Sequence, residues 1–409
     1  MRKTKSGKVF LIGFSLFLIY FLAFFQPANA SPSKPKSVKV AFIGDISGPY
    51  AAITGATYYG MTDALEYVNK ELGGINGVKM EGVIKDDGGR VAVGVSHYME
   101  VREMKPRPAM VYIIVSALGE ALRERLAEDK IVAISVTGVP AIYPAKYTFG
   151  WFPIYPDLFG AFIDWLKETW KETRAPRVAF LTWDSTYGRG PVTPEAYAYA
   201  KSKGVEMVAE ELFTPRDVFV GTQLFRIRAK KADWIYTNTT ANAPSIIVTS
   251  ARESAIKINL AGGLGMDWSS VYIAGKAAME GAISVYPNTS LDEENHKGIK
   301  ILRRYFEKNK RKKFDWNYMY QLAWQLVVTT RDVVKRVVDK DGWDNVKGET
   351  IKREMESLRD YRPLDLIHYT TTPKKHAPDK TYIMRFTDGK MIPIGGLRTC
   401  PDLRPAEFK

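Results

Sequence analysis

Segment 37–50 constrains the fold of this chain more than any other stretch. Val38 to Ile43 is an apolar run rich in β-branched residues, which is typical of a buried strand. The small residues of Gly44 to Pro49 end this run, and the pattern of Ala51 to Leu72 predicts a helix. A strand, a short turn and a helix in this order form the opening unit of a parallel α/β sheet.

Ligands of parallel α/β sheets bind where the strands end and the helices begin. The turn after the first predicted strand is therefore the first candidate site, and we place Ser47 and Tyr50 in it. Asp86 and Asp87 end the second predicted strand and offer either a pair of carboxylates or a solvated turn.

The alternation of strand and helix continues along the chain and predicts two α/β domains. Further strands of the first domain are expected at 78–85, 109–115 and 131–135, with helices at 91–104 and 120–129. The second domain is expected to have strands at 177–182, 205–212, 232–237 and 258–262, with helices at 158–173, 193–203, 223–231 and 243–254. Parallel strands joined through helices imply right-handed crossovers. The boundary between the domains is expected near Tyr147 to Tyr155.

The last third of the chain does not predict a third domain of its own. An extended piece is expected at 281–286, helices at 291–309, 318–340 and 347–358, and a hairpin around Thr387 to Lys390. The basic run Lys308 to Lys313 is interpreted as a solvated helix end and loop. We expect these elements to pack back onto the two α/β domains.

The N-terminus carries the pattern of a secretory signal peptide. Residues 2–8 are basic, Val9 to Phe25 is an apolar run without charge, and Ala28-Asn29-Ala30 offers a small-residue cleavage site. Residues 1–30 would then be removed, and the mature chain would begin near Ser31 in the periplasm. The length of the apolar run leaves an uncleaved membrane anchor as the alternative.

Composition and motifs argue against several classes of function. The formal net charge is +14, of which four charges lie before Ala30, so the mature chain would keep +10. No basic-aromatic motif accompanies this charge, which favours a solvated surface over nucleic-acid binding. The single cysteine, Cys400, precludes an intrachain disulfide, and the four histidines lack metal-ligand spacing. The common nucleophile, phosphate-loop and zinc motifs are absent, so we expect a binding protein without cofactor or enzymatic activity.

Short motifs in a regular order give the chain a family resemblance. They are Ile43-Gly44 with Ser47 to Tyr50, Gly73 to Gly77, Asp86-Asp87, Tyr187 to Gly190 and Glu280-Gly281. In these motifs, and over roughly residues 39–393, the chain resembles periplasmic substrate-binding proteins of the branched-chain amino-acid ABC-transporter type, such as leucine-binding protein. The resemblance implies the type I periplasmic binding fold, in which two Rossmann-like α/β lobes with parallel sheets close on a ligand about a hinge of three crossovers.

The resemblance also implies how the chain is divided and what it contacts. Lobe 1 would comprise residues 37–149 and 281–358, and lobe 2 residues 150–280 and 359–409. A small-molecule ligand would lie between the lobes of a monomer. The closed form would be presented to an ABC permease in the inner membrane.

The first ligand contact that the family implies is a serine after the third strand, which corresponds to Ser116 with Ala117 beside it. A hydroxyl and free backbone N–H groups at a helix N-terminus favour a carboxylate. The alternative for Ser116 is a plain helix N-cap.

The resemblance places further contacts after other strands. The hydroxyl pair that follows the fourth strand in the family corresponds to Ser135 and Thr137. Tyr187 matches the tyrosine that covers the ligand from lobe 2, with packing at the hinge as its alternative. Thr239 falls near one more contact position.

One position departs from the family. Amino-acid binders of this type carry an acid after the strand expected at 258–262, where this chain has Leu264. Asp267, three residues further on, is the candidate substitute. A buried ammonium without a partner is costly. The departure therefore indicates a ligand without an amino group, such as a carboxylate or an amide, or a different register.

Two functions share this fold and site. The first is a solute-binding component of an ABC importer for a small amino acid or a related carboxylate or amide. The second is a ligand-sensing periplasmic protein that presents its bound state to a membrane receptor. A secreted α/β enzyme is the third hypothesis, and the absence of catalytic motifs disfavours it.

Overall fold

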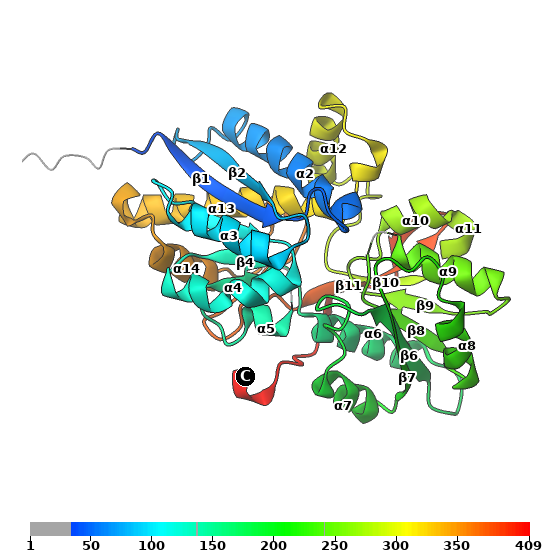
Figure 1. Cartoon of the computed structure of the whole chain (residues 1–409). Helices are drawn as coiled ribbons and strands as arrows, with labels where there is room; N and C mark the ends of the chain where they lie inside the picture. The colour runs from blue at the N-terminus through cyan, green and yellow to red at the C-terminus, as the bar shows by residue number, and fades with distance from the viewer. Residues whose placement is uncertain (1–33, 136–137, 241) are drawn as a thin grey trace, which may run out of the picture.

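The computed structural model describes residues 34–135, 138–240 and 242–409, which form two α/β lobes (Figure 1). The expected signal peptide at 1–30 and the candidate contact Thr137 lie outside the described residues. Within these ranges, no helix has both the length and the apolar character that a membrane span requires.

The first sheet is entirely parallel and contains the strand on which the sequence prediction begins. Its strands are β1 (Ser37–Gly44), β2 (Lys79–Asp86), β3 (Met110–Ile113), β4 (Ala133–Ser135) and β5 (Thr148–Gly150), in the order β2-β1-β3-β4-β5. Strand β5 is not predicted from the sequence, which indicates a domain boundary there. It pairs with β4 and closes this edge of the sheet.

Helices cover both faces of the first sheet, which explains why β1 is apolar on both sides. Val40 and Phe42 of β1 are buried in the core that includes α2 (Ala51–Lys70) and α13 (Tyr318–Asp341). Ala41 and Ile43 are buried on the opposite face, in the core that includes α3 (Val91–Arg102) and α4 (Ser116–Glu128). The remaining helices of this lobe are α5 (Val139–Ile142), α12 (Lys297–Lys308) and α14 (Gly348–Glu356).

Helices α2 and α13 pack at very close range. A Cβ at Gly60 of α2 would lie only 2.4 Å from the carbonyl oxygen of Tyr320 on α13. The absence of a side chain at Gly60 therefore brings the long α13 against the first sheet, although nearly 260 residues separate the two positions in the chain.

The second sheet is mixed. Its strands are β6 (Arg177–Trp183), β7 (Glu206–Phe213), β8 (Trp234–Thr237), β9 (Leu260–Gly262), β10 (Ile283–Tyr286), β11 (Lys380–Thr387) and β12 (Lys390–Pro393), in the order β12-β11-β10-β9-β8-β6-β7, and β13 (Arg398–Thr399) pairs with β11. Strands β6 to β10 run parallel, whereas β11 is antiparallel to β10 and to β12. Its helices are α6 (Tyr155–Thr169), α7 (Pro194–Ser202), α8 (Gly221–Ala229), α9 (Ala243–Glu253), α10 (Trp268–Ala274) and α11 (Lys276–Met279).

Strand β10 lies in the second sheet, whereas the expected lobe ranges place residues 281–286 in lobe 1. It pairs with β9 on one edge and with β11 on the other, and all four of its residues are buried. A fully buried strand needs partners on both edges, and the second sheet provides them before the chain leaves that lobe. From here, lobe 1 denotes the first sheet with its helices and lobe 2 the second sheet with its helices.

The chain passes between the two sheets three times: after β5, after β10 and between α14 and β11. Two of these passages are bonded to each other, because the N–H of Gly150 donates to the carbonyl of His376 and the Tyr369 hydroxyl donates to the carbonyl of Gly150. The predicted hinge of three crossovers is confirmed.

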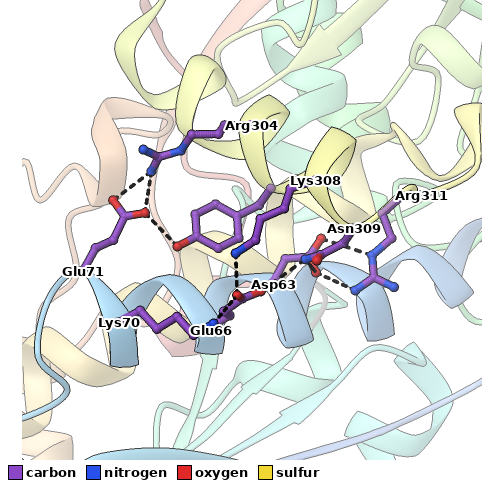
Figure 2. A network of polar contacts seen from close by, with 9 residues as sticks. Asp63, Glu66, Lys70, Glu71, Arg304, Lys308, Asn309 and Arg311 are labelled. Atoms are coloured by element: carbon purple, nitrogen blue, oxygen red, sulfur yellow. Dashed lines mark hydrogen bonds and ion pairs between the residues drawn. The ribbon is translucent and has the colours of Figure 1, made fainter.

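Helix α12 is held on α2 by a network of charged side chains (Figure 2). The sequence predicts this helix from residue 291, but it begins at Lys297, because the preceding residues form turns and the His296 side chain caps the helix. At the centre of the network, the fully buried carboxylate of Asp63 accepts hydrogen bonds from Arg311, Asn309 and Tyr320.

Glu66 of α2 and Glu71, the C-cap residue of the same helix, extend this network. Glu66 binds Lys70 and Lys308, and Glu71 binds both Arg304 and the hydroxyl of Tyr305 (Figure 2). Hydrogen bonds from Lys308 and Lys70 lower the pKa of Glu66 to about 2. The hydrogen bond from the Tyr305 hydroxyl lowers the pKa of Glu71 below its usual value.

Candidate functional site

A cavity of about 280 Å³ lies between the two lobes, at the carboxyl ends of both sheets. Small-molecule sites usually enclose roughly 300–1,000 Å³, so this cavity suits a small ligand. Lobe 1 contributes the start of α2 and the β3–α4 junction, lobe 2 contributes the turn after β6, and the start of α13 closes one side. The lining residues are Tyr50, Thr54, Ile114, Val115, Ser116, Ala117, Tyr155, Trp183, Ser185, Thr186, Tyr187, Thr240, Leu264, Tyr318 and Met319.

The N-terminus of α4 opens on this cavity. The helix begins at Ser116 after the extended residue Val115, and no side chain of the described residues caps it. The first backbone N–H groups of a helix have no intrahelical acceptors and carry a partial positive charge. The Ser116 hydroxyl lies 3.2 Å from the Tyr155 hydroxyl of lobe 2. This end of the cavity therefore offers donors to an anion.

Aromatic rings from both lobes form much of the remaining wall. The rings of Tyr50 in lobe 1 and Trp183 in lobe 2 have centroids 5.9 Å apart, and those of Tyr155 and Tyr187 are 5.2 Å apart. Trp183 is almost fully buried, and its indole N–H has no hydrogen-bond partner among the described residues. A buried donor without a partner costs free energy, so a ligand acceptor at this position would be favourable.

The described residues that line the cavity offer no negative charge to a cationic ligand. Of the described residues that line the cavity, none is Asp, Glu, Lys, Arg or His. Burial raises the pKa of Tyr187 well above its usual value, so this phenol stays neutral near pH 7. The lining therefore favours a carboxylate at α4 and disfavours an ammonium elsewhere.

Several of the candidate residues chosen from the sequence meet at this cavity. Tyr50, Ser116, Ala117 and Tyr187 all line it, and so does Leu264 at the position where the resemblance led us to look for an acid. The strands β1, β3, β6 and β9 bring these residues together, because the carboxyl ends of both sheets face the same space.

Three other candidates do not line the cavity. Ser47 is exposed and its hydroxyl bonds to Asp86. Ser135 is buried behind α4, where a Cβ at Gly119 would be only 2.5 Å from its hydroxyl. The Thr239 hydroxyl bonds to that of Thr237 at the end of β8, and its neighbour Thr240 lines the cavity instead.

Asp267 has a structural role in place of the expected ligand contact. One carboxylate oxygen caps α10 by accepting hydrogen bonds from the N–H and the hydroxyl of Ser269. The other oxygen accepts a hydrogen bond from the N–H of Tyr318 at 2.9 Å. The residue is 1% exposed and is absent from the cavity lining. Burial raises the pKa of Asp267 to about 6.

The raised pKa of Asp267 predicts a specific dependence of stability on pH. Its folded-state pKa of about 6 lies above the unfolded value of about 3.9. Its protonation therefore stabilises the fold fully below pH ~4, and this contribution is lost as the pH rises through ~6. We expect the unfolding free energy of the wild type minus that of Asp267→Asn to fall by about 2 kcal/mol between pH 4 and 7.

Chemical denaturation at several pH values measures this difference. Asp388→Asn is the control, because the Asp388 side chain is 89% exposed and should leave the pH profile unchanged. Parallel wild-type and Asp267→Asn curves over this range would contradict the prediction.

The sequence reasoning missed a second group of lining residues. Trp183 is the last residue of β6, and Ser185 and Thr186 follow it closely. The rule that ligands bind at the carboxyl ends of strands points to all three. Tyr318 and Met319 begin a helix far along the chain, and no local signal places them beside the first lobe.

Comparison with protein families identifies the architecture. The model of the family described as "periplasmic binding protein" matches residues 37–390, which is most of the chain. The chain belongs to the periplasmic binding protein family. This finding confirms the family resemblance of the sequence motifs in this binding protein.

Individual relatives of this binding protein are distant. It is 21% identical over 271 residues to the leucine-, isoleucine-, valine-, threonine- and alanine-binding protein of Pseudomonas aeruginosa, which covers 64% of this chain and 70% of that protein. A valine-bound branched chain amino acid ABC transporter structure from Thermus thermophilus matches with a TM-score of 0.82 at 17% identity, covering 91% of this chain and 98% of the other. A fatty acid ABC transporter substrate-binding protein from Thermomonospora curvata matches with a TM-score of 0.76 at 19% identity, covering 91% and 95%.

Proposed function

We propose that this protein is an extracytoplasmic solute-binding protein that captures a small carboxylate without an ammonium group between its lobes and delivers it to an ABC importer. The observation that carries the proposal is a helix N-terminus without a capping side chain beside a cavity wall without charged side chains, both among the described residues. A carboxylate would be held by the first N–H groups of α4 and the Ser116 hydroxyl, while the rest of the ligand would contact aromatic rings.

The distant relatives are compatible with this ligand class. One similar structure is described with bound valine and another is described as a fatty acid transporter component. Both molecules carry a carboxylate, and only valine carries an ammonium. The uncharged wall, with Leu264 in it and Asp267 bonded elsewhere, favours the class without the ammonium.

Binding at this site is expected to depend on the first turn of α4. Ser116→Ala removes the hydroxyl alone, whereas Ser116→Pro removes the hydroxyl and a backbone N–H. Proline is tolerated at the first helical position, and Val115 already has the extended φ of −98° and ψ of 118° that a following proline requires. Because a hydrogen bond to a charged group contributes about 1.5–3 kcal/mol, we expect Ser116→Pro to weaken carboxylate binding by at least about tenfold and Ser116→Ala by less.

A thermal-shift screen of branched, straight-chain and aromatic monocarboxylates tests the proposal. A ligand at 100 times its dissociation constant adds about 2.7 kcal/mol to the unfolding free energy, which gives a clear rise in the melting temperature. Circular dichroism and the melting temperature without ligand control for the fold of both variants. A screen without any stabilising acid, or acids that stabilise all three proteins equally, would contradict the proposed site.

A further inference from the structure

A basic and aromatic surface lies where the loop between α12 and α13 meets α10 of lobe 2. We call it the rim surface and define it by five residues: Lys310, Lys312 and Lys313 between α12 and α13, and Tyr272 and Ile273 of α10. The three lysines are exposed, and Tyr272 and Ile273 are 51% and 43% exposed. Figure 1 shows the end of α12 and its following loop close to α10 at the top of the molecule.

The rim lysines are not needed to hold their own segment in place. Three other basic residues nearby do form ion pairs with acids of α2 and its C-cap: Arg304 binds Glu71, Lys308 binds Glu66 and Arg311 binds Asp63 (Figure 2). By contrast, none of the three rim lysines has an ion pair with a described residue. Asp315 follows in sequence but is partly buried and forms no ion pair with a described residue either.

The apolar half of the rim surface lies on a helix that has exposed side chains but no charged residue. Helix α10 has the sequence WSSVYIA and carries no charged residue. Exposed tyrosine and tryptophan side chains next to cations are typical of protein interfaces, where aromatic residues are enriched and bury much area. The rim surface therefore combines three lysines that form no ion pair with a described residue and two apolar side chains that stay about half exposed.

The rim surface is assembled from both lobes. The Lys313 ammonium lies 5.7 Å from the ring centre of Trp268 and 5.8 Å from that of Tyr272, and the rings of Tyr272 and Phe314 are 5.6 Å apart. Trp268 and Tyr272 belong to lobe 2, whereas Lys313 and Phe314 belong to the loop that leads from α12 to α13. The distances between these groups therefore depend on how the two lobes are arranged.

A chain of direct bonds connects the cavity to the rim surface. Tyr318 lines the cavity, and its backbone N–H donates to Asp267. The other oxygen of Asp267 caps α10 through the N–H of Ser269, and α10 carries Tyr272. Through Asp267, the cavity residue Tyr318 is therefore bonded to the helix that carries the apolar half of the rim surface.

We propose that the rim surface is the docking site for an acidic extracytoplasmic surface of the importer's membrane subunit, which binds it when the lobes are closed. This inference rests on the proposed function. Charge complementarity indicates the chemistry of the partner, because three exposed ammonium groups without an ion pair to a described residue favour a surface that carries carboxylates. The surface contains residues of both lobes, so its shape depends on whether the lobes are closed. A partner protein that binds this surface can therefore distinguish the closed form.

Matched charge reversals test the inference. Lys310→Glu/Lys312→Glu changes the rim, whereas Lys297→Glu/Lys300→Glu makes the same change in charge on the exposed part of α12 before the network of Figure 2. None of these four lysines forms an ion pair with a described residue or lines the cavity. The readout is stimulation of ATP hydrolysis by the importer's permease–ATPase complex in nanodiscs, titrated with each protein at two salt concentrations.

We expect the rim variant to need a roughly tenfold or higher concentration for half-maximal stimulation, with the difference shrinking at high salt, and the control variant to behave like the wild type. Equal effects of both variants would overturn the inference and leave only a general charge effect. Retention of the wild type, but not of the rim variant, on anionic phosphatidylglycerol vesicles without transporter would overturn it in favour of a lipid partner. Failure of the wild type to stimulate any importer would instead contradict the proposed function itself.

Discussion

A Leu264→Asp variant is expected to bind α-amino acids that the wild-type protein rejects. Leu264 lines the cavity and is 3% exposed, so an aspartate there would place a carboxylate in a wall that otherwise has no charged residue among those described. The ammonium of leucine or phenylalanine would then gain a partner inside the cavity. Close buried charge pairs contribute roughly 1.5–7 kcal/mol of coupling, so calorimetry should show at least a tenfold gain in amino-acid affinity.

The same variant should lose affinity for acids without an ammonium, because two carboxylates would share one small cavity. Leu264→Asn is the matched control, since it has the same shape and polarity without the charge, and it should gain no amino-acid binding. The unliganded Leu264→Asp protein should also melt at a lower temperature, because it buries an unpaired charge. If the Asp and Asn variants show the same ligand preference, the role of charge at this position is contradicted.

An Asp63→Ala variant is expected to lose about 3–5 kcal/mol of unfolding free energy. The carboxylate of Asp63 is fully buried and accepts hydrogen bonds from Arg311, Asn309 and Tyr320. Its removal leaves the guanidinium of Arg311, which is only 16% exposed, without its anion. Breaking a buried pair on one side costs more than the pair itself contributes, because the remaining charge stays desolvated.

Glu71→Ala provides the comparison within the same network. Glu71 is 40% exposed and Arg304 is 55% exposed, and ion pairs at this exposure contribute about 0–1 kcal/mol. Urea denaturation of both variants should therefore separate a large loss for Asp63 from a small one for Glu71. Asp63→Asn, which keeps the shape of the side chain, gives a milder second variant if the alanine variant does not fold. Equal losses at Asp63 and Glu71 would show that burial does not set the cost.

The regular elements follow from the sequence because their patterns are local. The strand predicted at 38–43 and the helix predicted at 51–72 appear as β1 and α2, since a doubly covered strand must be apolar on both faces and a helix must keep its periodicity. Strand β5 has only three residues, and such a short run carries no periodic signal. The sheet to which β10 belongs depends on its edge partners, which lie elsewhere in the chain.

The residues of the candidate site likewise fall into those that local patterns predict and those that only the packing of distant segments brings to the cavity. Ser116, Ala117 and Tyr187 were predictable because they follow strands at the edge where such sheets bind ligands, aided by the motifs of the family. Tyr318 and Met319 were not, because the packing of α13 on α2 through Gly60 brings them to the cavity.

Asp267 shows a different limit of the sequence reasoning. An aspartate two residues before a serine at a helix start is a capping pattern, and this local explanation accounts for it better than the ligand role that its closeness to Leu264 suggested.

Isothermal titration of matched acid pairs tests the central claim most directly. The pairs are 4-methylpentanoate with leucine and 3-phenylpropionate with phenylalanine, in which the members differ only by the ammonium group. The uncharged cavity wall predicts that, in at least one pair, the acid binds the wild-type protein at least about tenfold more tightly than its amino acid, because the ammonium would be buried without a partner. Equal or tighter binding of both amino acids would contradict the account of the cavity.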